Sequence, residues 1–499
     1  MSVKASPTAR TWTVDDDGPA DFDSIQEAIN NASSGDTVFV HIGAYYEHVV
    51  INKTITLVGE DSNFTIIDGN ATNNVIYIRA NNVTVKSFTV RKSGMYPYNG
   101  ILIDHSTGNV IINNKVIYNY EGISLLSSSS NVVCDNIISS NNDGIYFYSS
   151  SSNVVSGNTI FSSNYDGIDL YYSSSNVVSG NVILHNNFAG MSLYYSSSNV
   201  VCGNTILSNY PGINVALLSN NNTIYHNNFN NTDQVWSDSA NVWNYGDEGN
   251  YWSGYTGQDL NGDGIGDEPY VIDENNKDNN PLVGIFSDFD VSLERETYHV
   301  TIISNSTISD FNFEFGIETG NKIIRFNVTD NDDTVGFSRV TIPIELMKYP
   351  YIVLVDGMEV SPVLLNISDK TKVCLYFTYS NKNSTIRIIC SETLHHYYEL
   401  LAKYFELQTD LNNLSEKYYD FLDDYSLLLG NYSRLLESFE AMNATYQKHL
   451  LDYSEQMQNI RSLMYIFAST TAVFITTTIY LSKRVHERTA RKSKEFEGE

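Results

Sequence analysis

The chain has 499 residues, and its 58 aspartates and glutamates outnumber its 29 lysines and arginines. A formal charge of −29 repels phosphate backbones, so the composition excludes a protein that binds nucleic acid through charge. With only nine prolines and as many as 36 tyrosines, a largely disordered chain is excluded as well. The length predicts roughly two to four domains.

The first 50 residues are predicted to contain a short N-terminal remnant, followed by a segment that caps the structure after it. Residues 1–10 lack the apolar run of a secretory signal, so we expect a truncated or mis-started N-terminus. Residues 11–50 are expected to cover one end of the structure that follows. Within them, Ser24 and Glu27 have the spacing of a capping box, which predicts a short helix from Ile25 to Ile29.

An internal repeat of 22 or 23 residues dominates the region between residues 99 and 229. Its recurring glycines are Gly100, Gly122, Gly144, Gly167, Gly190 and Gly212. Two asparagine columns keep the same period, one running from Asn109 to Asn222 and the other from Asn114 to Asn227. Because apolar residues alternate only over short stretches, the repeat predicts strands and not helices. We therefore expect a parallel β-helix over residues 11–282, with rungs about 4.8 Å apart and amide ladders at the turns.

Acidic and aromatic side chains hold fixed places in this repeat. The residue before the glycine is Glu121, Asp143 or Asp166 in three consecutive units, and acids stacked in this way raise a pKa or recruit a cation. The outward positions two and four residues after the glycine include Ser124, Tyr146, Asp169, Ser192, Asn214, Tyr148, Tyr171 and Tyr194. Sugar rings pack on aromatic faces while their hydroxyls bond to carboxylates. The predicted glycan-binding residues are therefore Tyr146, Tyr148, Tyr171 and Tyr194.

The acids themselves allow two interpretations. Asp143, Asp166 and Asp169 could include the acid and base of a glycosidase, about 5 to 9 Å apart. Alternatively each Asp-Gly pair only makes a turn, which we favour because Ala189 and Pro211 occupy the same column. From Val116 to Asn276 there is no lysine or arginine, so a polyanionic sugar would meet only acidic side chains. Neutral glycan is the expected ligand.

Residues 250–282 are expected to end the β-helix with a structural calcium loop. The spacing matches the first nine positions of an EF-hand-type loop. The expected Ca²⁺ ligands are Asp259, Asn261, Asp263, the Ile265 carbonyl and Asp267. Tyr270 replaces the usual bidentate glutamate, for which Asp273 could substitute, so the expected affinity is modest. The alternative is a plain Asp/Gly turn.

Residues 11–282 resemble the NosD-type β-helices of the carbohydrate-binding and sugar-hydrolase (CASH) class, which are common on archaeal cell surfaces. The resemblance lies in the cap, the asparagine and glycine columns, and the segment NYWSGYTGQDLNGDGIGDEPYVIDENNKDNNPL. It implies a right-handed β-helix without specifying an activity. The family name also implies copper delivery, but residues 116–276 contain only His185 and His226 and no clustered methionines.

Residues 283–392 hold about seven alternating segments, the number expected for an immunoglobulin-like β-sandwich. If residues 381–383 form a three-residue hairpin loop, the register places Cys374 opposite Cys390, and a cross-strand disulfide is predicted. Cys134 and Cys202 occupy one column of the repeat three rungs apart, roughly 14 Å, which is too far for a bond.

Residues 393–461 keep a heptad repeat without a break. Tyrosine fills most a positions from Tyr397 onward, and leucine fills most d positions from Leu400 onward. Because no turn sequence reverses the helix, we expect a parallel, homo-oligomeric coiled-coil stalk about 95 Å long. The alternative is one long helix packed back on the sandwich.

Residues 462–482 form an uncharged run about 31 Å long as a helix, which predicts one transmembrane helix. The tail, residues 483–499, carries six basic side chains and is expected to stay in the cytoplasm. Fourteen N-x-S/T sequons occur in the chain and none follows Asn443. We therefore expect a cell-surface, single-pass glycoprotein with its N-terminal domains outside.

Three functions fit these predictions. The one we favour is a membrane-anchored surface protein that presents a glycan-binding β-helix on a stalk, for adhesion or in a surface layer. The second is an extracellular polysaccharide hydrolase, and the third is a purely structural surface-layer component. We expect binding more than catalysis, and an enzyme on this fold would be a glycoside hydrolase.

Overall fold

The computed structural model describes residues 9–316, 320–329, 335–348, 350–380, 383–424 and 429–495. The chain forms two compact units, residues 1–398 and residues 399–499. The first contains a β-helix followed by antiparallel sheets, and the second is helical.

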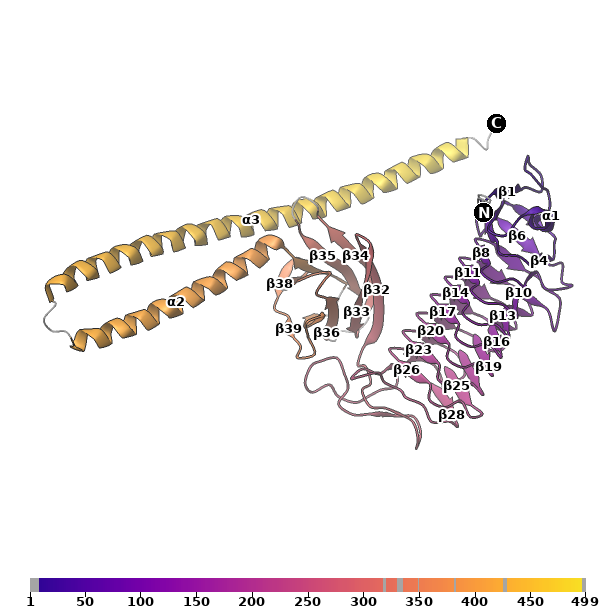
Figure 1. The fold of residues 1–499 in the computed structure, drawn as a ribbon, viewed down its shortest axis with the longest axis horizontal. Coiled ribbons are helices and arrows are strands. Elements are labelled where there is room, and N and C mark those ends of the chain that lie inside the picture. Colours follow the sequence, from indigo (N-terminus) through magenta and orange to yellow (C-terminus); the bar gives the residue numbers. More distant parts are fainter. Residues whose placement is uncertain are drawn as a thin grey trace, which may run out of the picture. The chain divides into compact units, whose positions relative to one another are not determined.

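The β-helix consists of three parallel sheets, A, B and C, and each coil adds one strand to C, then A, then B (Figure 1). Sheet A contains β1 (Thr11–Val14), β2 (Thr37–Val40), β5 (Thr56–Gly59), β8 (Thr84–Lys86), β11 (Val110–Ile112), β14 (Val132–Cys134), β17 (Val154–Ser156), β20 (Val177–Ser179), β23 (Val200–Cys202) and β26 (Thr223–Tyr225). Sheet B contains β3 (Gly43–Tyr45), β6 (Thr65–Asp68), β9 (Thr89–Arg91), β12 (Lys115–Ile117), β15 (Ile137–Ser139), β18 (Thr159–Phe161), β21 (Val182–Leu184), β24 (Thr205–Leu207), β27 (Asn228–Asn230) and β29 (Tyr251–Trp252). Sheet C contains β4 (Val49–Ile51), β7 (Ile76–Ile78), β10 (Asn99–Asp104), β13 (Glu121–Leu126), β16 (Asp143–Tyr148), β19 (Ile168–Tyr171), β22 (Met191–Tyr194), β25 (Ile213–Ala216) and β28 (Val235–Ser237). The predicted parallel β-helix is confirmed.

The repeat glycines stand where successive coils approach most closely. A Cβ atom on Gly144 would lie 2.4 Å from the carbonyl oxygen of Gly167 in the next coil and 2.5 Å from the Ile160 side chain. Only glycine fits such a position without moving the backbone. The strand residues that follow, Ile145 and Phe147, are fully buried in the core. The glycine period of the sequence is therefore the period of the coil.

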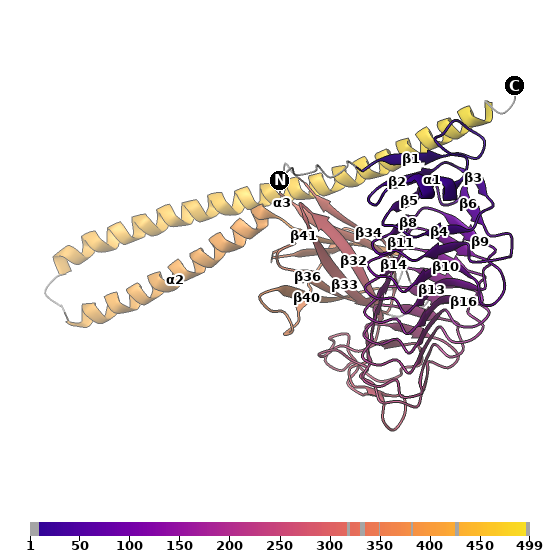
Figure 2. The same cartoon turned by 45° about the vertical axis from the view of Figure 1, so that its right-hand side comes forward.

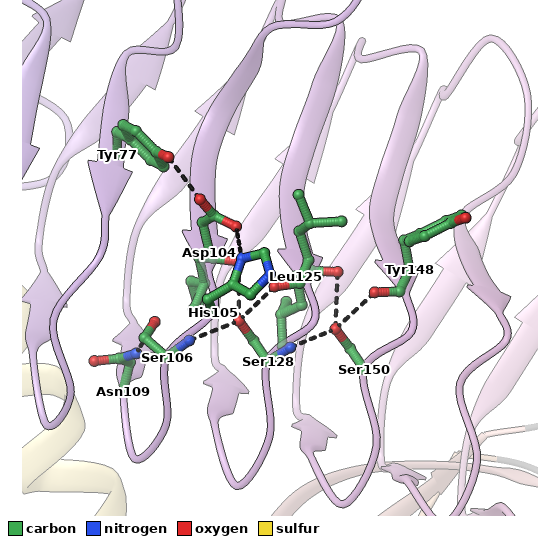
Figure 3. A network of polar contacts seen from close by, with 11 residues as sticks. Tyr77, Asp104, His105, Ser106, Asn109, Leu125, Ser128, Tyr148 and Ser150 are labelled. Carbon is green, nitrogen blue, oxygen red and sulfur yellow. Dashed lines mark hydrogen bonds and ion pairs between the residues drawn. The ribbon is translucent and has the colours of Figure 1, made fainter.

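Buried polar ladders join the coils at the turns. In both predicted asparagine columns the backbone N–H of one asparagine donates to the Oδ1 of the next, as from Asn131 to Asn153 at 2.9 Å and from Asn136 to Asn158 at 3.0 Å. A third ladder, absent from our predictions, includes Asn186 and Asn209. Figure 3 shows a serine ladder as well, in which the Oγ of one serine accepts the backbone N–H of the serine in the previous coil. These bonds satisfy polar groups that would otherwise destabilise the interior.

Both ends of the β-helix are closed. At the N-terminal end, α1 (Ile25–Asn31) is capped by Ser24 and buries Ile25 and Ile29 in the core, so the predicted helix exists and is two residues longer. The carboxylate of Glu47 accepts the N–H groups of the first turn. At the other end the buried indoles of two tryptophans cover the last coil, and Asp278 accepts the indole N–H of Trp252 at 2.9 Å.

Two five-stranded antiparallel sheets follow a short antiparallel pair, β30 (Tyr270–Val271) and β31 (Lys277–Asp278). One sheet contains β32 (Ile285–Leu293), β33 (Glu296–Ser304), β36 (Val335–Pro343), β40 (Lys372–Ser380) and β39 (Val363–Leu364). The other contains β34 (Thr307–Phe315), β35 (Lys322–Thr329), β41 (Ser384–Cys390), β37 (Ile352–Val355) and β38 (Met358–Val360). Residues from both sheets share one core, so this is a sandwich, with ten strands where we expected about seven.

The predicted disulfide is wrong. β40 and β41 belong to different sheets, so they do not pair as the predicted hairpin. Cys374 therefore pairs in register with Thr341, and Cys390 pairs with Lys322. Both thiols are buried and no disulfide joins them, and the Cys390 Sγ donates to the Lys348 carbonyl at 2.9 Å.

A polar junction connects the β-helix to the sandwich. Glu248, which follows the last coils, accepts a hydrogen bond from the buried guanidinium of Arg339 on β36. The second carboxylate oxygen of Glu248 lies 2.7 Å from His226 Nε2, and the His226 ring stacks on Phe286 with centroids 4.1 Å apart. Although burial opposes it, these partners lower the pKa of Glu248 to about 2, so the carboxylate is charged.

The helical unit differs from the predicted uninterrupted stalk. α2 (Glu392–Asp424) and α3 (Leu429–Glu495) lie side by side and antiparallel in Figures 1 and 2, and the Tyr404 and Tyr446 rings stack 5.8 Å apart. Our prediction of one uninterrupted heptad helix was therefore wrong, because α2 and α3 are two antiparallel helices; residues 425–428 lie outside the described residues. The a-position tyrosines Tyr404 and Tyr446 are half-buried, whereas d-position Leu407 and Met442 stay exposed.

α3 also contains the candidate membrane span. Within Leu435–Val485 the helix is long and apolar enough to cross a bilayer. The hydroxyls that lower its hydropathy are satisfied locally, since Thr471 donates to the Phe467 carbonyl and Thr478 donates to the Phe474 carbonyl. Such bonds to the preceding turn reduce the penalty of placing a hydroxyl in lipid.

Candidate functional site

Sheet C places the predicted acids side by side on its outer face. Glu121 is the register partner of Asp143, and Asp169 lies in register between Tyr146 and Ser192. Because Ile145 and Phe147 point into the core, Tyr146 between them points outward, and Asp169 shares its register position. A Cβ atom on Gly144 would meet the core residue Ile160, so Gly144 faces inward and Asp143 before it faces outward. The structure thus brings together Asp143, Asp166 and Asp169, and adds Glu121, which was not among the predicted site residues.

The acids are tied to the backbone of the next coil. The Asp143 Oδ1 accepts the N–H of Asp166 at 2.8 Å, and the Asp166 Oδ1 accepts the N–H of Ala189 at 2.9 Å. Each carboxylate therefore has one oxygen committed to the fold. By contrast, the Oδ1 of Asp169 and the Oε2 of Glu121 are buried without a hydrogen-bond partner among the described residues.

The environment of these acids favours their neutral forms. Burial, followed by the charge of Asp143, raises the pKa of Glu121 to about 9 and that of Asp166 to about 7. Burial and the charges of Asp166 and Asp143 raise the pKa of Asp169 well above its usual range. Burial also raises the pKa of Asp143, which the Asp166 N–H partly opposes. This surface can therefore hold several protons near neutral pH.

Stacked tyrosines flank the acids on one side. The rings of Tyr148 and Tyr171 are nearly parallel, with centroids 5.9 Å apart, and Tyr194 follows at 6.3 Å from Tyr171. Two tyrosines that we did not predict, Tyr172 and Tyr195, stack at 4.7 Å beside them. We call these five residues the tyrosine platform. The predicted Tyr146 lies nearer the acids, and burial with the charge of Asp169 raises its pKa.

A second aromatic column flanks the acids on the other side. It consists of the aromatic residues two positions before the repeat glycines, a place that only Asn142 fills with a polar residue, namely Tyr98, Tyr120, Tyr165, Phe188 and Tyr210. Backbone hydrogen bonds keep the column in line, for example from Phe188 N–H to the Tyr165 carbonyl at 3.2 Å. Tyr165, Phe188 and Tyr210 are exposed. Sequence reasoning missed this column, although its period is visible in the repeat.

A charged cluster lies at one end of the tyrosine platform. Asp104 is in register with Leu126, which is in register with Tyr148. Figure 3 shows the Tyr77 hydroxyl donating to Asp104 at 2.6 Å while the other carboxylate oxygen contacts His105 Nδ1. Burial raises the pKa of Asp104, but the bonds from Tyr77 and His105 outweigh it and lower that pKa.

In the predicted calcium loop, backbone N–H groups donate hydrogen bonds to the loop's own carboxylates. The two oxygens of Asp259 accept the N–H groups of Gly262, Asp263 and Gly264, and the Asp267 Oδ2 accepts the N–H of Leu260. Gly264 has a φ of +84°, the left-handed conformation that its position in such a loop requires. The donor set is all oxygen, which suits Ca²⁺. Within the described residues, however, the acids that gather closely enough to share an ion lie elsewhere, at Asp15–Asp17 and around His299.

Comparisons with known proteins agree with this fold. Residues 29–257 match the family model described as "Periplasmic copper-binding protein (NosD)". The resemblance to NosD-type β-helices is confirmed. A "Cell surface glycoprotein" of Methanothermus fervidus is 35% identical over 98 residues, which are 19% of this chain and 16% of the relative. The chain therefore spans only a small part of that protein's length.

Solved structures with a similar fold are distant. Pectin methylesterase from carrot is 13% identical, with a TM-score of 0.37 over 48% of this chain and 90% of the other. DFA-IIIase from Arthrobacter chlorophenolicus A6 in complex with DFA-III is also 13% identical, with a TM-score of 0.38 over 48% of this chain and 75% of the other. Likeness at this level concerns the fold alone.

Proposed function

We propose that this chain is a membrane-anchored cell-surface protein whose β-helix binds neutral glycan on the outer face of sheet C. The observation that carries the proposal is the row of acids between two aromatic columns. Exposed rings such as Tyr148 and Tyr165 offer flat apolar faces to sugar rings, and the partly exposed Asp169 offers a carboxyl group as a partner for hydroxyls.

The charge of this face supports a neutral ligand. Residues 116–276 contain no lysine or arginine, so nothing on these coils attracts an anionic sugar. Because the acids are already held near their neutral forms, hydroxyl groups can approach them without the full penalty of desolvating a carboxylate. A polyuronate, in contrast, would add negative charge to the same row.

The surface placement rests on the candidate span in α3 and on the sequence around it. We place the β-helix and sandwich outside, because the basic tail follows the span and the sequons precede it.

We also propose that the exposed d-position leucines of the helical hairpin pair with a second copy of the chain. The 259–267 loop is proposed to bind Ca²⁺, with a structural role.

Binding and catalysis are separated by one pair of assays on the purified full-length protein in detergent. We expect retention of neutral oligosaccharides on a glycan array without release of reducing sugar. The second candidate function is glycoside hydrolysis, favoured by the buried Asp166 with a pKa of about 7, a value suited to a general acid. Reducing-sugar release that disappears in Asp166→Asn would establish it. A chain that neither binds nor cleaves would indicate the purely structural role.

A further inference from the structure

The N-x-S/T sequons are distributed unevenly along the β-helix. Five precede residue 83, and two more, at Asn221 and Asn230, follow residue 220. Between these groups, residues 83–220 contain 21 asparagines and not one sequon. The coils without a sequon carry Glu121, the three aspartates of the acid row (Asp143, Asp166 and Asp169) and the tyrosine platform.

The fold explains why these asparagines are unavailable. A ladder asparagine such as Asn158 points inward, and its Nδ2 donates to the carbonyl oxygens of Val133 and Ser156 and to Asn181 Oδ1. A glycosyl transferase could not reach that nitrogen without unfolding the coil. The two residues after a ladder asparagine also begin the next strand, where apolar residues are required, as in Asn153-Val-Val. The ladders thus keep sequons out of the middle coils.

The sequon asparagines at the two ends are different. Five of these seven are exposed and have an amide nitrogen that is unengaged among the described residues, namely Asn52, Asn70, Asn82, Asn221 and Asn230. In the other two, Asn31 and Asn63, the Nδ2 donates to the Glu27 carbonyl and to Asp61 Oδ1. Three of the five, Asn70, Asn82 and Asn221, have φ values between 50° and 59°, which marks tight turns at the surface. None of the five Nδ2 atoms donates a hydrogen bond within the part of the chain that the structure describes. Each nitrogen is therefore accessible for reaction.

We propose that N-linked glycans are attached to Asn52, Asn70, Asn82, Asn221 and Asn230, leaving the coils between them bare so that the acid row and both aromatic columns stay accessible. In each case Nδ2 forms a bond to C1 of a sugar carried by a glycosyl phosphate donor. The C1–O bond to the phosphate breaks, the phosphate leaves with the electron pair, and the amide proton passes to a base of the transferase. The inference rests on the outward placement proposed above.

Site mapping tests the first part. The full-length protein is produced in a host that N-glycosylates exported proteins, and glycopeptides are identified by mass spectrometry. We expect glycans at the five asparagines, and each Asn→Gln variant should lose one glycan mass. Glycans on the sandwich sequons, such as Asn366, with all five proposed β-helix sites unmodified would overturn the inference. A chain without any glycan would instead refute the outward placement itself.

A designed sequon tests the second part of the proposal, that coils without glycans keep the acid row and the aromatic columns accessible. Ser149 is exposed beside Tyr148 and has a φ of +51°, which asparagine tolerates well. Ser149→Asn creates the sequon Asn-Ser-Ser, whereas Ser149→Asn with Ser151→Ala has the same new side chain without a sequon. We expect the glycosylated single variant to lose at least about tenfold in glycan affinity, and the double variant to bind as the unmodified chain does.

Equal affinity in a fully glycosylated Ser149→Asn chain would overturn the claim that bare coils keep the face accessible. If the unmodified chain binds no glycan, the proposed binding function fails, while the mapped attachment sites still decide where glycans are added. The two failures are therefore distinguishable.

Discussion

Replacing Asp166 by asparagine should stabilise the β-helix at neutral and alkaline pH. Asp166 is 6% exposed, and its pKa rises from the ordinary value of 3.8 to about 7 through burial and the charge of Asp143. The folded chain thus holds a proton that the unfolded chain releases, so this residue's contribution to stability is full below pH 4 and is lost as pH rises to about 7. A difference of about three pH units corresponds to roughly 4 kcal/mol at pH 8.

Asparagine keeps the shape of Asp166 and an oxygen that can accept the N–H of Ala189, but it never ionises. We expect about 2 to 4 kcal/mol of extra stability at pH 8 and no more than about 1 kcal/mol at pH 4.5. For a domain of this size that is roughly 4 to 16 °C in melting temperature. Thermal unfolding of the full-length protein, followed by circular dichroism at pH 4.5, 6, 7 and 8, measures it.

The matched control is Asp135→Asn, which removes an exposed carboxylate from a turn of the same β-helix. Its melting temperature should differ little from that of the unmodified chain at every pH. An Asp166→Asn chain that is destabilised equally at pH 4.5 and pH 8 would refute the reasoning, because the carboxyl would then act only through its hydrogen bond.

Three further outcomes are expected. Tyr171→Ala should weaken neutral-glycan binding about tenfold by microarray titration, whereas Tyr118→Ala, an exposed tyrosine outside both aromatic columns, should not. Calcium should raise the melting temperature of the full chain and Asp263→Ala should abolish the rise; a chelator without effect on the unmodified chain would contradict the site. Leu407→Asp should dissociate a self-associated chain in sedimentation experiments, and a monomeric unmodified protein would contradict pairing through the hairpin.

The β-helix was predictable because the same residue types recur at the same positions in every coil. A glycine that must meet the next coil and an asparagine that must bond to its neighbour leave little choice at those positions. The third asparagine ladder was not predicted because Ser163 interrupts its period, standing where the other coils have asparagine. The second aromatic column was not predicted because Asn142 interrupts it between Tyr120 and Tyr165.

The sandwich and the helices were harder to predict because their strand and helix partners are distant in the sequence. Residues 381–383 suit a hairpin loop locally, but β40 and β41 find their partners in opposite sheets, so the register and the predicted Cys374–Cys390 bond both failed. Heptads alone do not tell whether a helix pairs with another chain or with itself. In this chain the a-position tyrosines Tyr404 and Tyr446 pack within one chain.

The junction between β-helix and sandwich gives the last prediction. Arg339 is 2% exposed, and its charge is balanced by Glu248, a residue of the other domain. Removing one partner leaves a buried charge alone, so Glu248→Gln or Arg339→Met should each lower stability by about 3 to 5 kcal/mol. The double variant should lose less than the sum, because neither charge then remains unpaired. Urea unfolding of the four chains gives the coupling energy. Strictly additive losses would show that the two residues act separately, and the domains would then be held by apolar contacts such as those of Phe286 and Leu282.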